Sequence, residues 1–396
     1  MRMGEDVSDA CHAEVQELRM LVLGCGMMGK AIAYDLARDR SVAEVICADR
    51  DRNQVDSLLA RVRSNKISGH RLDVADIASV VSLMRKADAA ICALPEGLNV
   101  RVARAALRAR IHMVDLAYGS HLLDLDAQAR KSGIAIVLDC GVAPGITNIL
   151  AWRGASLMDE VDDIRIVCGG LPQNPVPPLM YRITWSTRGL INMYCWKAKV
   201  VRNGRVVEVD AMSELERTRF PGVGELEAFV TDGLSTLLMT MKGRVQNMVE
   251  KTARYPGHAE KILAMRDVGL FSTEPVEVDG RKVVPREVAI AVLDKVLRLG
   301  DEKDITVLSV DVTGTKNERR VRRRYVMVDR YDERRRFTSM ARTTGYTAAV
   351  IARMIVQREI RGVGVLPPEI AVADVYDEFI SQLGKRGIKI EEEYRD

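Results

Sequence analysis

The sequence has few aromatic residues, few histidines and no ordered pattern of cysteines. Aromatic residues make up 5% of the 396 positions, and the five histidines are dispersed along the chain. The seven cysteines contain neither a C-x-x-C pair nor the dense spacing of a disulfide framework. No histidine or cysteine cluster has the spacing of a metal site. These absences predict a protein with no disulfide framework and no bound metal, in a reducing cytoplasm.

Long apolar segments and a strong excess of one charge are also missing. No stretch approaches the ~20 apolar residues that span a bilayer, and residues 1–18 lack the apolar core of a signal peptide. The 59 Lys and Arg residues nearly balance the 55 Asp and Glu residues, so no strong field attracts a polyanion. We therefore expect neither a membrane nor a nucleic acid as partner. The basic runs at 319–324 and 334–336 are interpreted as one solvated face of strands that pair through a turn at 331–337.

The chain is longer than the roughly 250–300 residues that one hydrophobic core usually holds. We expect four segments, namely a polar N-terminal extension (1–18), a Rossmann dinucleotide-binding domain (19–145), a substrate and dimerisation domain (146–345) and C-terminal helices that pack back on the first domain (346–396). Because two-fold dimers are the commonest assemblies and large sheets often join subunits, a homodimer is expected.

In the first half, short apolar runs alternate with segments of helical periodicity. This alternation predicts an α/β fold with a doubly wound parallel sheet. The expected strands lie at 19–24, 43–51, 70–73, 87–95, 112–117 and 133–141.

From about residue 163 the pattern changes to longer strands with polar alternation, expected at 163–170, 178–186, 196–201, 304–314 and within 322–340. Asn203-Gly204 and Asp279-Gly280 are hairpin signals. We therefore predict a second, α+β domain on a mainly antiparallel sheet, followed by amphipathic helices at 345–360 and 372–387.

The first strand is followed by Gly24-x-Gly26-x-x-Gly29 and then by a helix. In this context the first glycine makes the turn, the second lets the backbone approach a pyrophosphate and the third lets helix meet strand. The amides of Met27 and Met28 open the helix and favour an anion. The pattern predicts a nicotinamide dinucleotide as cofactor.

Asp49 ends the second strand, 20 residues after Gly29. We expect its carboxylate to bind the adenosine ribose and repel a 2′-phosphate, which favours NAD. Arg50 leaves NADP open, because a neighbouring Arg can accommodate that phosphate or simply stack on adenine. Asp73 with Val74 is predicted at the adenine edge, or as a helix cap. The remaining expected cofactor contacts are Ala93, Leu94, Pro95 and Leu116.

Seven segments of the sequence resemble the saccharopine dehydrogenase superfamily, and most closely its lysine 6-dehydrogenase-like members. The segments are GCGMMG, VDLAY, DCGVAPGITN, GGLPQNPVPPLMY, GELEAFVTDGLSTL, RYPGH and MARTTGYTAA. The resemblance implies NAD(P)-linked oxidation at a carbon that bears an amine. For the lysine 6-dehydrogenase group it implies oxidative deamination of the lysine ε-amine to a semialdehyde, which cyclises to a piperideine carboxylate.

Two positions depart from the family pattern. Where the family tends to carry Glu-Tyr, the chain reads Met193-Tyr194, and Arg188 stands where the family often has an acidic residue. Two alternatives therefore stay open. One is a saccharopine-type enzyme that acts on a secondary amine, and the other is a dinucleotide-binding sensor without catalytic activity.

Ligands of open parallel sheets lie beyond the carboxyl ends of the strands, which directs attention to Asp115 and Tyr118. The resemblance implies that Asp115 lies beside the nicotinamide and the amine, and Tyr118 is a candidate proton relay; the alternatives are a turn cap and simple packing. Cys140 is at a position that touches substrate in related enzymes, or it is a small buried apolar residue.

Further candidates come from the second half of the chain. Asp232 is a carboxylate available to a substrate ammonium, with Glu225, Glu227 and Thr231 near it in sequence. Arg342, Thr343 and Thr344 would clamp an α-carboxylate, or form a salt bridge and a helix cap. The turn at 143–145 offers amides to a carboxylate or starts a helix, and His258 is either an acid–base group or structural.

Overall fold

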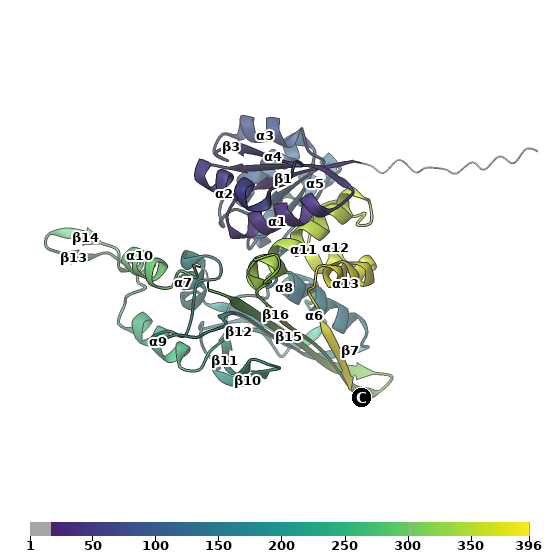
Figure 1. The fold of residues 1–396 in the computed structure, drawn as a ribbon. Coiled ribbons are helices and arrows are strands. Elements are labelled where there is room, and N and C mark those ends of the chain that lie inside the picture. The colour runs from purple at the N-terminus through teal and green to yellow at the C-terminus, as the bar shows by residue number, and fades with distance from the viewer. Residues whose placement is uncertain (1–16, 301, 396) are drawn as a thin grey trace, which may run out of the picture.

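The computed structural model describes residues 17–300 and 302–395, so the expected N-terminal extension lies almost entirely outside the described residues. The first domain is built on a seven-stranded parallel sheet, in which β1, β2 and β3 follow one another from the middle of the sheet to one edge (Figure 1). The full order is β17-β6-β5-β4-β1-β2-β3, with bounds β1 (Leu18–Leu23), β2 (Val42–Asp49), β3 (Ile67–Arg71), β4 (Ala89–Cys92), β5 (His112–Asp115), β6 (Ala135–Val137) and β17 (Gly364–Leu366). β17 was not expected, and it shows that the C-terminal segment completes the first sheet.

Helices cover both faces of this sheet, because alternate residues of its strands are apolar on both sides. In β1, Met20 and Val22 pack toward α1 (Met27–Arg38), whereas Leu21 and Leu23 belong to the apolar cluster of the opposite face. The first face also carries α2 (Arg52–Val62) and α11 (Ser339–Val356), and the second carries α3 (Ile77–Met84), α4 (Asn99–Ala109), η1 (Ser120–Leu125) and α5 (Asp126–Ser132). The predicted doubly wound parallel sheet is confirmed.

The second sheet has nine strands and is mainly antiparallel, as predicted, with one parallel pair between β7 and β12. Its strands are β7 (Glu160–Pro172), β8 (Ala198–Arg202), β9 (Arg205–Val209), β10 (Glu216–Phe220), β11 (Gly224–Val230), β12 (Val245–Arg254), β15 (Asp304–Lys316), β16 (Arg319–Arg330) and β18 (Glu391–Arg395). The helices α6 (Ile146–Ser156) and α11 pack on one face. The homodimer expected for such a sheet stays a prediction.

An arm projects from the second domain (Figure 1). It contains the hairpin of β13 (Val276–Val278) and β14 (Arg281–Val283), with Asp279-Gly280 at its turn as expected. Asn203-Gly204 likewise turns β8 into β9. The helices around the arm are α7 (Thr187–Cys195), α9 (His258–Asp267) and α10 (Pro285–Val296).

Two expected strand features of the second half are wrong. Residues 178–186 form no strand, since only Ile183 makes a single bridge, and α7 starts directly after them. β15 and β16 are joined by the turn at Asn317 and Glu318 and not by residues 331–337, because that segment leads into α11.

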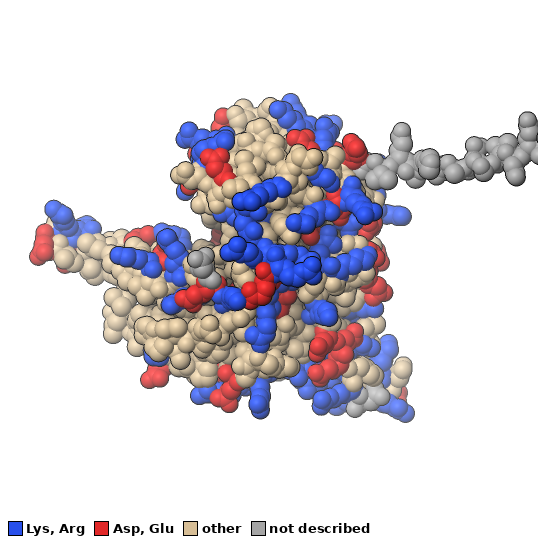
Figure 2. All heavy atoms as spheres, in the orientation of Figure 1, with Lys and Arg blue, Asp and Glu red and all other residues tan. Residues whose placement is uncertain are grey.

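The arginines of β16 consequently do not form one solvated face. Arg322 hydrogen-bonds to Asp311 of the neighbouring strand, while Arg323 points to the other face of the strand and donates to Glu392 of β18. On the face shown in Figure 2, Lys and Arg side chains gather in a band between the two domains, with Asp and Glu side chains among them.

The long helix α11 differs from the expected amphipathic helix at 345–360. It starts at Ser339, and every one of its residues is buried, because it lies between the two sheets and contacts α1 on one side and β15 on the other. The short elements that complete the chain are α8 (Leu237–Thr240), α12 (Pro368–Ala371), η2 (Ala373–Val375) and α13 (Tyr376–Lys385). In the part of the chain that the structure describes, every helix is too short or too polar to span a bilayer.

Candidate active site

The glycine loop has the shape that a bound pyrophosphate requires. Gly24 has φ +100°, and a Cβ there would collide with the carbonyl of Ala93, just as a Cβ on Gly29 would collide with the carbonyl of Gly24. Nothing lies within 4 Å of a Cβ built on Gly26, so the backbone is open on that side. No side chain caps the start of α1 at Met27, which leaves its first amides available to a phosphate.

Asp49 lies against this loop. Its Oδ2 accepts a hydrogen bond from the amide of Cys25 at 2.8 Å, and its Oδ1 accepts one from the amide of Asp51 at 2.9 Å. The carboxylate is therefore fixed beside the turn, while Arg50 is exposed. Asp73 accepts a hydrogen bond from the amide of Ala75 in the turn before α3, but the helix-cap alternative for Asp73 is wrong, because Asp76 is the N-cap of α3.

The other residues predicted to contact the cofactor follow the strands β3, β4 and β5, and their role stays a prediction. Ala93 packs against Gly24, and Val74, Leu94 and Pro95 follow nearby strands at the same edge of the sheet. The amide of Leu116 donates to the carbonyl of Cys92 at 3.1 Å. The open Gly26 and the uncapped amides of α1 fit a nicotinamide dinucleotide.

Asp115 ends β5 and is fully buried. Its Oδ2 accepts a hydrogen bond from Asn99 Nδ2 at 2.8 Å, and its Oδ1 accepts one from the amide of Ala117 at 3.3 Å. Burial raises the pKa of Asp115 to about 7, and the nearby carboxyl of Asp139 acts in the same direction. A carboxyl with a pKa near neutrality can both take and return a proton.

Asp139 is a buried carboxyl that sequence reasoning did not select. It follows β6, as Asp115 ends β5, and its left-handed φ of +53° is unusual for a residue other than glycine. Ser235 Oγ donates to Asp139 at 2.5 Å and the amide of Gly119 donates at 2.9 Å. Burial raises the pKa of Asp139 to about 6. The signal was available, because the carboxyl-end rule that selected Asp115 applies equally to Asp139.

Tyr118 lies between these carboxyls and the second domain. Burial and the neighbouring carboxyls of Asp232 and Asp139 raise the pKa of its phenol. Asp232 accepts a hydrogen bond from the amide of Lys199 at 3.1 Å, and burial raises its pKa. The structure thus brings Asp115, Tyr118 and Asp232 into one neighbourhood.

A second acidic group lies deeper in the second domain. Thr231 Oγ1 donates to Glu250 Oε2 at 2.6 Å and lies 2.8 Å from Thr252 Oγ1. Thr252 Oγ1 is in turn 3.6 Å from the sulfur of Met193. Burial raises the pKa of Glu250 to about 8, with Asp232 as a further contribution. Neither Glu250 nor Thr252 was selected from the sequence, because nothing in their strand pattern separates them from ordinary core residues.

Glu369 connects the C-terminal segment to the same region. Thr236 and Thr240 donate to its two carboxyl oxygens at 2.9 and 2.8 Å, and Asn148 donates to Thr236 at 3.1 Å. Burial raises the pKa of Glu369 to about 7, with Asp139 adding to it. Among residues 17–300 and 302–395, no Lys or Arg forms an ion pair with any of the five carboxyls of this cluster, Asp115, Asp139, Asp232, Glu250 and Glu369.

Comparison with known families decides the classification. Residues 20–137 match the saccharopine dehydrogenase NADP binding domain, and residues 141–388 match the saccharopine dehydrogenase C-terminal domain. The chain belongs to the saccharopine dehydrogenase family.

Individual relatives agree with this assignment. The chain is 27% identical over 270 residues to the mitochondrial alpha-aminoadipic semialdehyde synthase of Bos taurus, a match that covers 65% of this chain and 29% of that protein. It is 28% identical over 268 residues to the NADP(+), L-glutamate-forming saccharopine dehydrogenase of Pyricularia oryzae, covering 64% of this chain and 58% of that protein. The match therefore spans less than two thirds of either relative.

A solved structure shows the same fold. The apo saccharopine dehydrogenase (L-Glu forming) of Saccharomyces cerevisiae superposes with a TM-score of 0.80 at 21% sequence identity, covering 96% of this chain and 100% of that one. The two-sheet arrangement is thus that of a saccharopine dehydrogenase.

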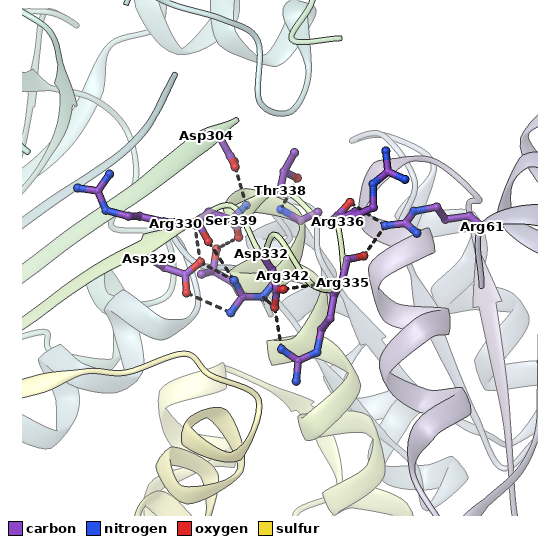
Figure 3. Close-up of polar contacts among 12 residues, drawn as sticks. Arg61, Asp304, Asp329, Arg330, Asp332, Arg335, Arg336, Thr338, Ser339 and Arg342 are labelled. Atoms are coloured by element: carbon purple, nitrogen blue, oxygen red, sulfur yellow. Dashed lines mark hydrogen bonds and ion pairs between the residues drawn. The ribbon is translucent and has the colours of Figure 1, made fainter. Parts of the chain in front are cut away.

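The predicted carboxylate clamp of this family member is occupied by its own side chains. Figure 3 shows Arg342 between Asp329 and Asp332, at the start of α11. Its guanidinium nitrogens lie 3.2 Å from both oxygens of Asp329 and 3.8 Å from Asp332. Thr343 donates to the carbonyl of Ser339 within the helix. Arg342 thus forms the salt bridge that was the alternative interpretation.

Residues 329–342, which run from the end of β16 to the start of α11 and are called the hinge below, connect the two domains (Figure 3). Arg61 of α2 donates to the carbonyls of Arg335 and Arg336 at 2.5 and 2.7 Å, and its guanidinium lies over the ring of Phe337. Asp304 accepts from the first amides of α11. The hydroxyl of Thr344 donates to the sulfur of Met340 at 3.6 Å. The contacts of this cluster hold the two domains together.

Two further candidates, His258 and Cys140, form hydrogen bonds within the protein core. The ring of His258 donates from Nδ1 to the carbonyl of Leu179 at 2.8 Å and accepts from Tyr194 at 3.0 Å, and burial lowers the pKa of His258 to about 3. It is therefore neutral at physiological pH. The thiol of Cys140 donates to the carbonyl of Leu138, and burial raises its pKa, so it is no nucleophile.

The turn at 143–145 starts α6 and does not present its amides to a ligand. The amide of Gly145 donates to Asn148 Oδ1 at 3.3 Å, and the amides of Ile146 and Thr147 donate to the carbonyls of Gly141 and Val142. The helix-capping interpretation is the one that the structure shows.

Proposed function

We propose that the chain is a nicotinamide-dependent oxidoreductase that oxidises the amine-bearing carbon of a basic amino acid, with the ε-amine of L-lysine as the leading substrate. The observation that carries the proposal is the cluster of five carboxyls without an ion pair, four of which (Asp115, Asp139, Glu250 and Glu369) are buried. Unpaired buried carboxyls are costly. A substrate that brings its own ammonium groups offsets that cost.

The cofactor would be held by Gly26 and the first amides of α1, with Asp49 at the adenosine ribose. Bound there, the nicotinamide ring supplies the redox chemistry by accepting a hydride. We infer a preference for NAD from the fixed carboxylate of Asp49. The exposed Arg50 and the NADP named in the family description support NADP as the alternative.

Asp115 is the proposed base. A free lysine ammonium has a pKa of about 10.4, and hydride loss from the adjacent carbon requires the neutral amine. The proton passes from the substrate nitrogen to the Asp115 carboxylate, whose pKa near 7 matches the task. Asn99 holds that carboxylate by its hydrogen bond to Oδ2, and the phenol of Tyr118 lies near the neighbouring carboxyls of Asp139 and Asp232.

Saccharopine, a secondary amine, is the second candidate, because relatives of the chain carry that substrate in their names. Such a substrate has more carboxylates than lysine and needs more cationic partners. Arg254, which acts electrostatically on Glu250, is committed to Tyr194 and to the carbonyl of Ala253. The described residues of the cluster therefore favour lysine.

A substrate panel tests the proposal. Lysine, ornithine, diaminopimelate and saccharopine are assayed with NAD and with NADP by the absorbance of the reduced nicotinamide. We expect the highest kcat/KM with lysine and NAD. Turnover of saccharopine alone would reject the proposed substrate, and turnover with NADP alone would reject the proposed role of Asp49.

A further inference from the structure

Glu250 is a buried carboxyl that the proposed reaction at Asp115 does not use. Resting on the proposed function, we propose that Glu250, presented by Thr231 and Thr252, binds the second ammonium group of a diamino substrate and so sets the preference for diamines. The site would hold the α-ammonium of lysine while the ε-amine reacts.

One oxygen of Glu250 is fixed and the other is free. The residue is 4% exposed, and its Oε2 accepts from Thr231, which is itself 1% exposed. Its Oε1 accepts no hydrogen bond from any described residue, yet it is not one of the fully enclosed unpaired atoms of the molecule. A ligand can therefore reach the one free acceptor of an otherwise buried carboxyl.

Small and uncharged neighbours pack against the Glu250 carboxyl. A Cβ built on Gly233 would lie 2.6 Å from both Cδ and Oε2 of Glu250. The uncharged thioether sulfur of Met193 lies 3.6 Å from Thr252 Oγ1, one of the two hydroxyls beside Glu250. Within residues 17–300 and 302–395, Asp232 is the one carboxyl that acts on Glu250, so the site carries one strong anchor for one cation.

Asp232 links Glu250 to the reacting end. It acts electrostatically on both Glu250 and Tyr118, so the two ends belong to one acidic strip. Arg254, the one cation among the described residues that acts on Glu250, donates to Tyr194 and lies 4.6 Å from the ring of Tyr181. An ammonium from the substrate therefore meets no competing side chain at Oε1.

The test compares lysine with ε-aminocaproate, which keeps the reacting amine and the carboxylate but lacks the α-ammonium. For Glu250→Gln we expect the KM for lysine to rise roughly 10- to 100-fold, as for a lost hydrogen bond between charged groups. The kinetic constants for ε-aminocaproate should stay within about twofold. Glu225→Gln, on an exposed position of β11, is the matched control and should change neither substrate.

Equal losses for both substrates, or no loss for either, would overturn the proposal. Gly233→Ala is the second variant, because its Cβ displaces Glu250 without removing the carboxyl, and it should reduce the preference for lysine in the same direction. If the wild type oxidises neither compound, the proposed function fails, but calorimetric binding of cadaverine and pentylamine to the NAD-loaded protein still tests the site. Selective loss of cadaverine binding in Glu250→Gln supports it, and unchanged binding rejects it.

Discussion

Two buried acidic clusters of the molecule differ in what neutralises them. In the hinge, Asp329 and Asp332 surround the guanidinium of Arg342, and Asp304 accepts backbone amides at the start of α11. In the candidate active site, Asp115 and its neighbours have hydroxyl, amide and carboxamide donors but no ion-paired cation among the described residues. The hinge carboxylates are paired with a cation, whereas the carboxyls of the candidate active site are not.

This difference separates a structural role from a functional one. Burial raises the pKa of Asp329 to about 6 although Arg342 opposes the shift, and burial raises the pKa of Asp115 to about 7 without such opposition. A buried charge that is paired contributes to folding specificity, and one that is left unpaired is typical of functional sites. The comparison predicts activity defects from the candidate active site and stability defects from the hinge.

The largest effect is expected from Asp115→Asn. The variant keeps an acceptor for Asn99 but cannot take a proton, so kcat/KM for lysine should fall roughly 100- to 10,000-fold. Steady-state kinetics measure this, with Asp124→Asn, at an exposed position, as the control. A loss below about threefold would remove Asp115 from the proton transfer.

The same variant has a stability signature with a defined sign. Folding raises the pKa of Asp115 from 3.8 to about 7, so between these pH values the native state keeps a proton that the unfolded state has lost. Wild-type stability attributable to this group is therefore present below about pH 4 and lost as pH rises through 7. Asp115→Asn should melt at least as high as the wild type at pH 8, measured by thermal denaturation.

Arg342→Gln should produce the opposite pattern. Removing one partner of a buried ion pair leaves Asp329 without its cation, so the free energy of unfolding should fall by about 3–5 kcal/mol. Urea denaturation measures this, and Arg334→Gln, at an exposed position of the same loop, is the control. Activity per folded molecule should stay near that of the wild type. A strong rise in KM with unchanged stability would instead restore the predicted role as a substrate clamp.

The cofactor half of the candidate active site was largely predictable from the sequence. Local rules act there, because Gly24 must adopt a positive φ and Gly29 must pack closely, and both demands act within one strand–turn–helix unit. Asp115 could be predicted for the same reason, since it ends a strand whose direction the alternating pattern fixes.

The substrate half was not predictable in the same way. Strand pairing places Glu250 in the sheet, and loop packing brings Ser235 to Asp139. Both contacts join residues that are far apart in sequence, which periodicity does not encode. Arg342 is the reverse case. Its local sequence predicted a substrate clamp, but in the folded protein Asp329 of β16 binds its guanidinium. The missed β17 has the same cause, since three residues are too few to carry a pattern.

The most direct test of the account is the number of protons exchanged when lysine binds the NADH-loaded protein at pH 7, because the reduced cofactor accepts no hydride and turnover therefore releases no proton. Calorimetry in buffers of different ionisation enthalpy gives this number. We predict net proton release, because Asp115 and Glu250, whose pKa values are raised to about 7 and about 8, hold protons in the candidate active site and lose them when an ammonium arrives. Release should be smaller in Glu250→Gln. Proton uptake, or no exchange at all, would contradict the claim that the unpaired carboxyls await a cationic substrate.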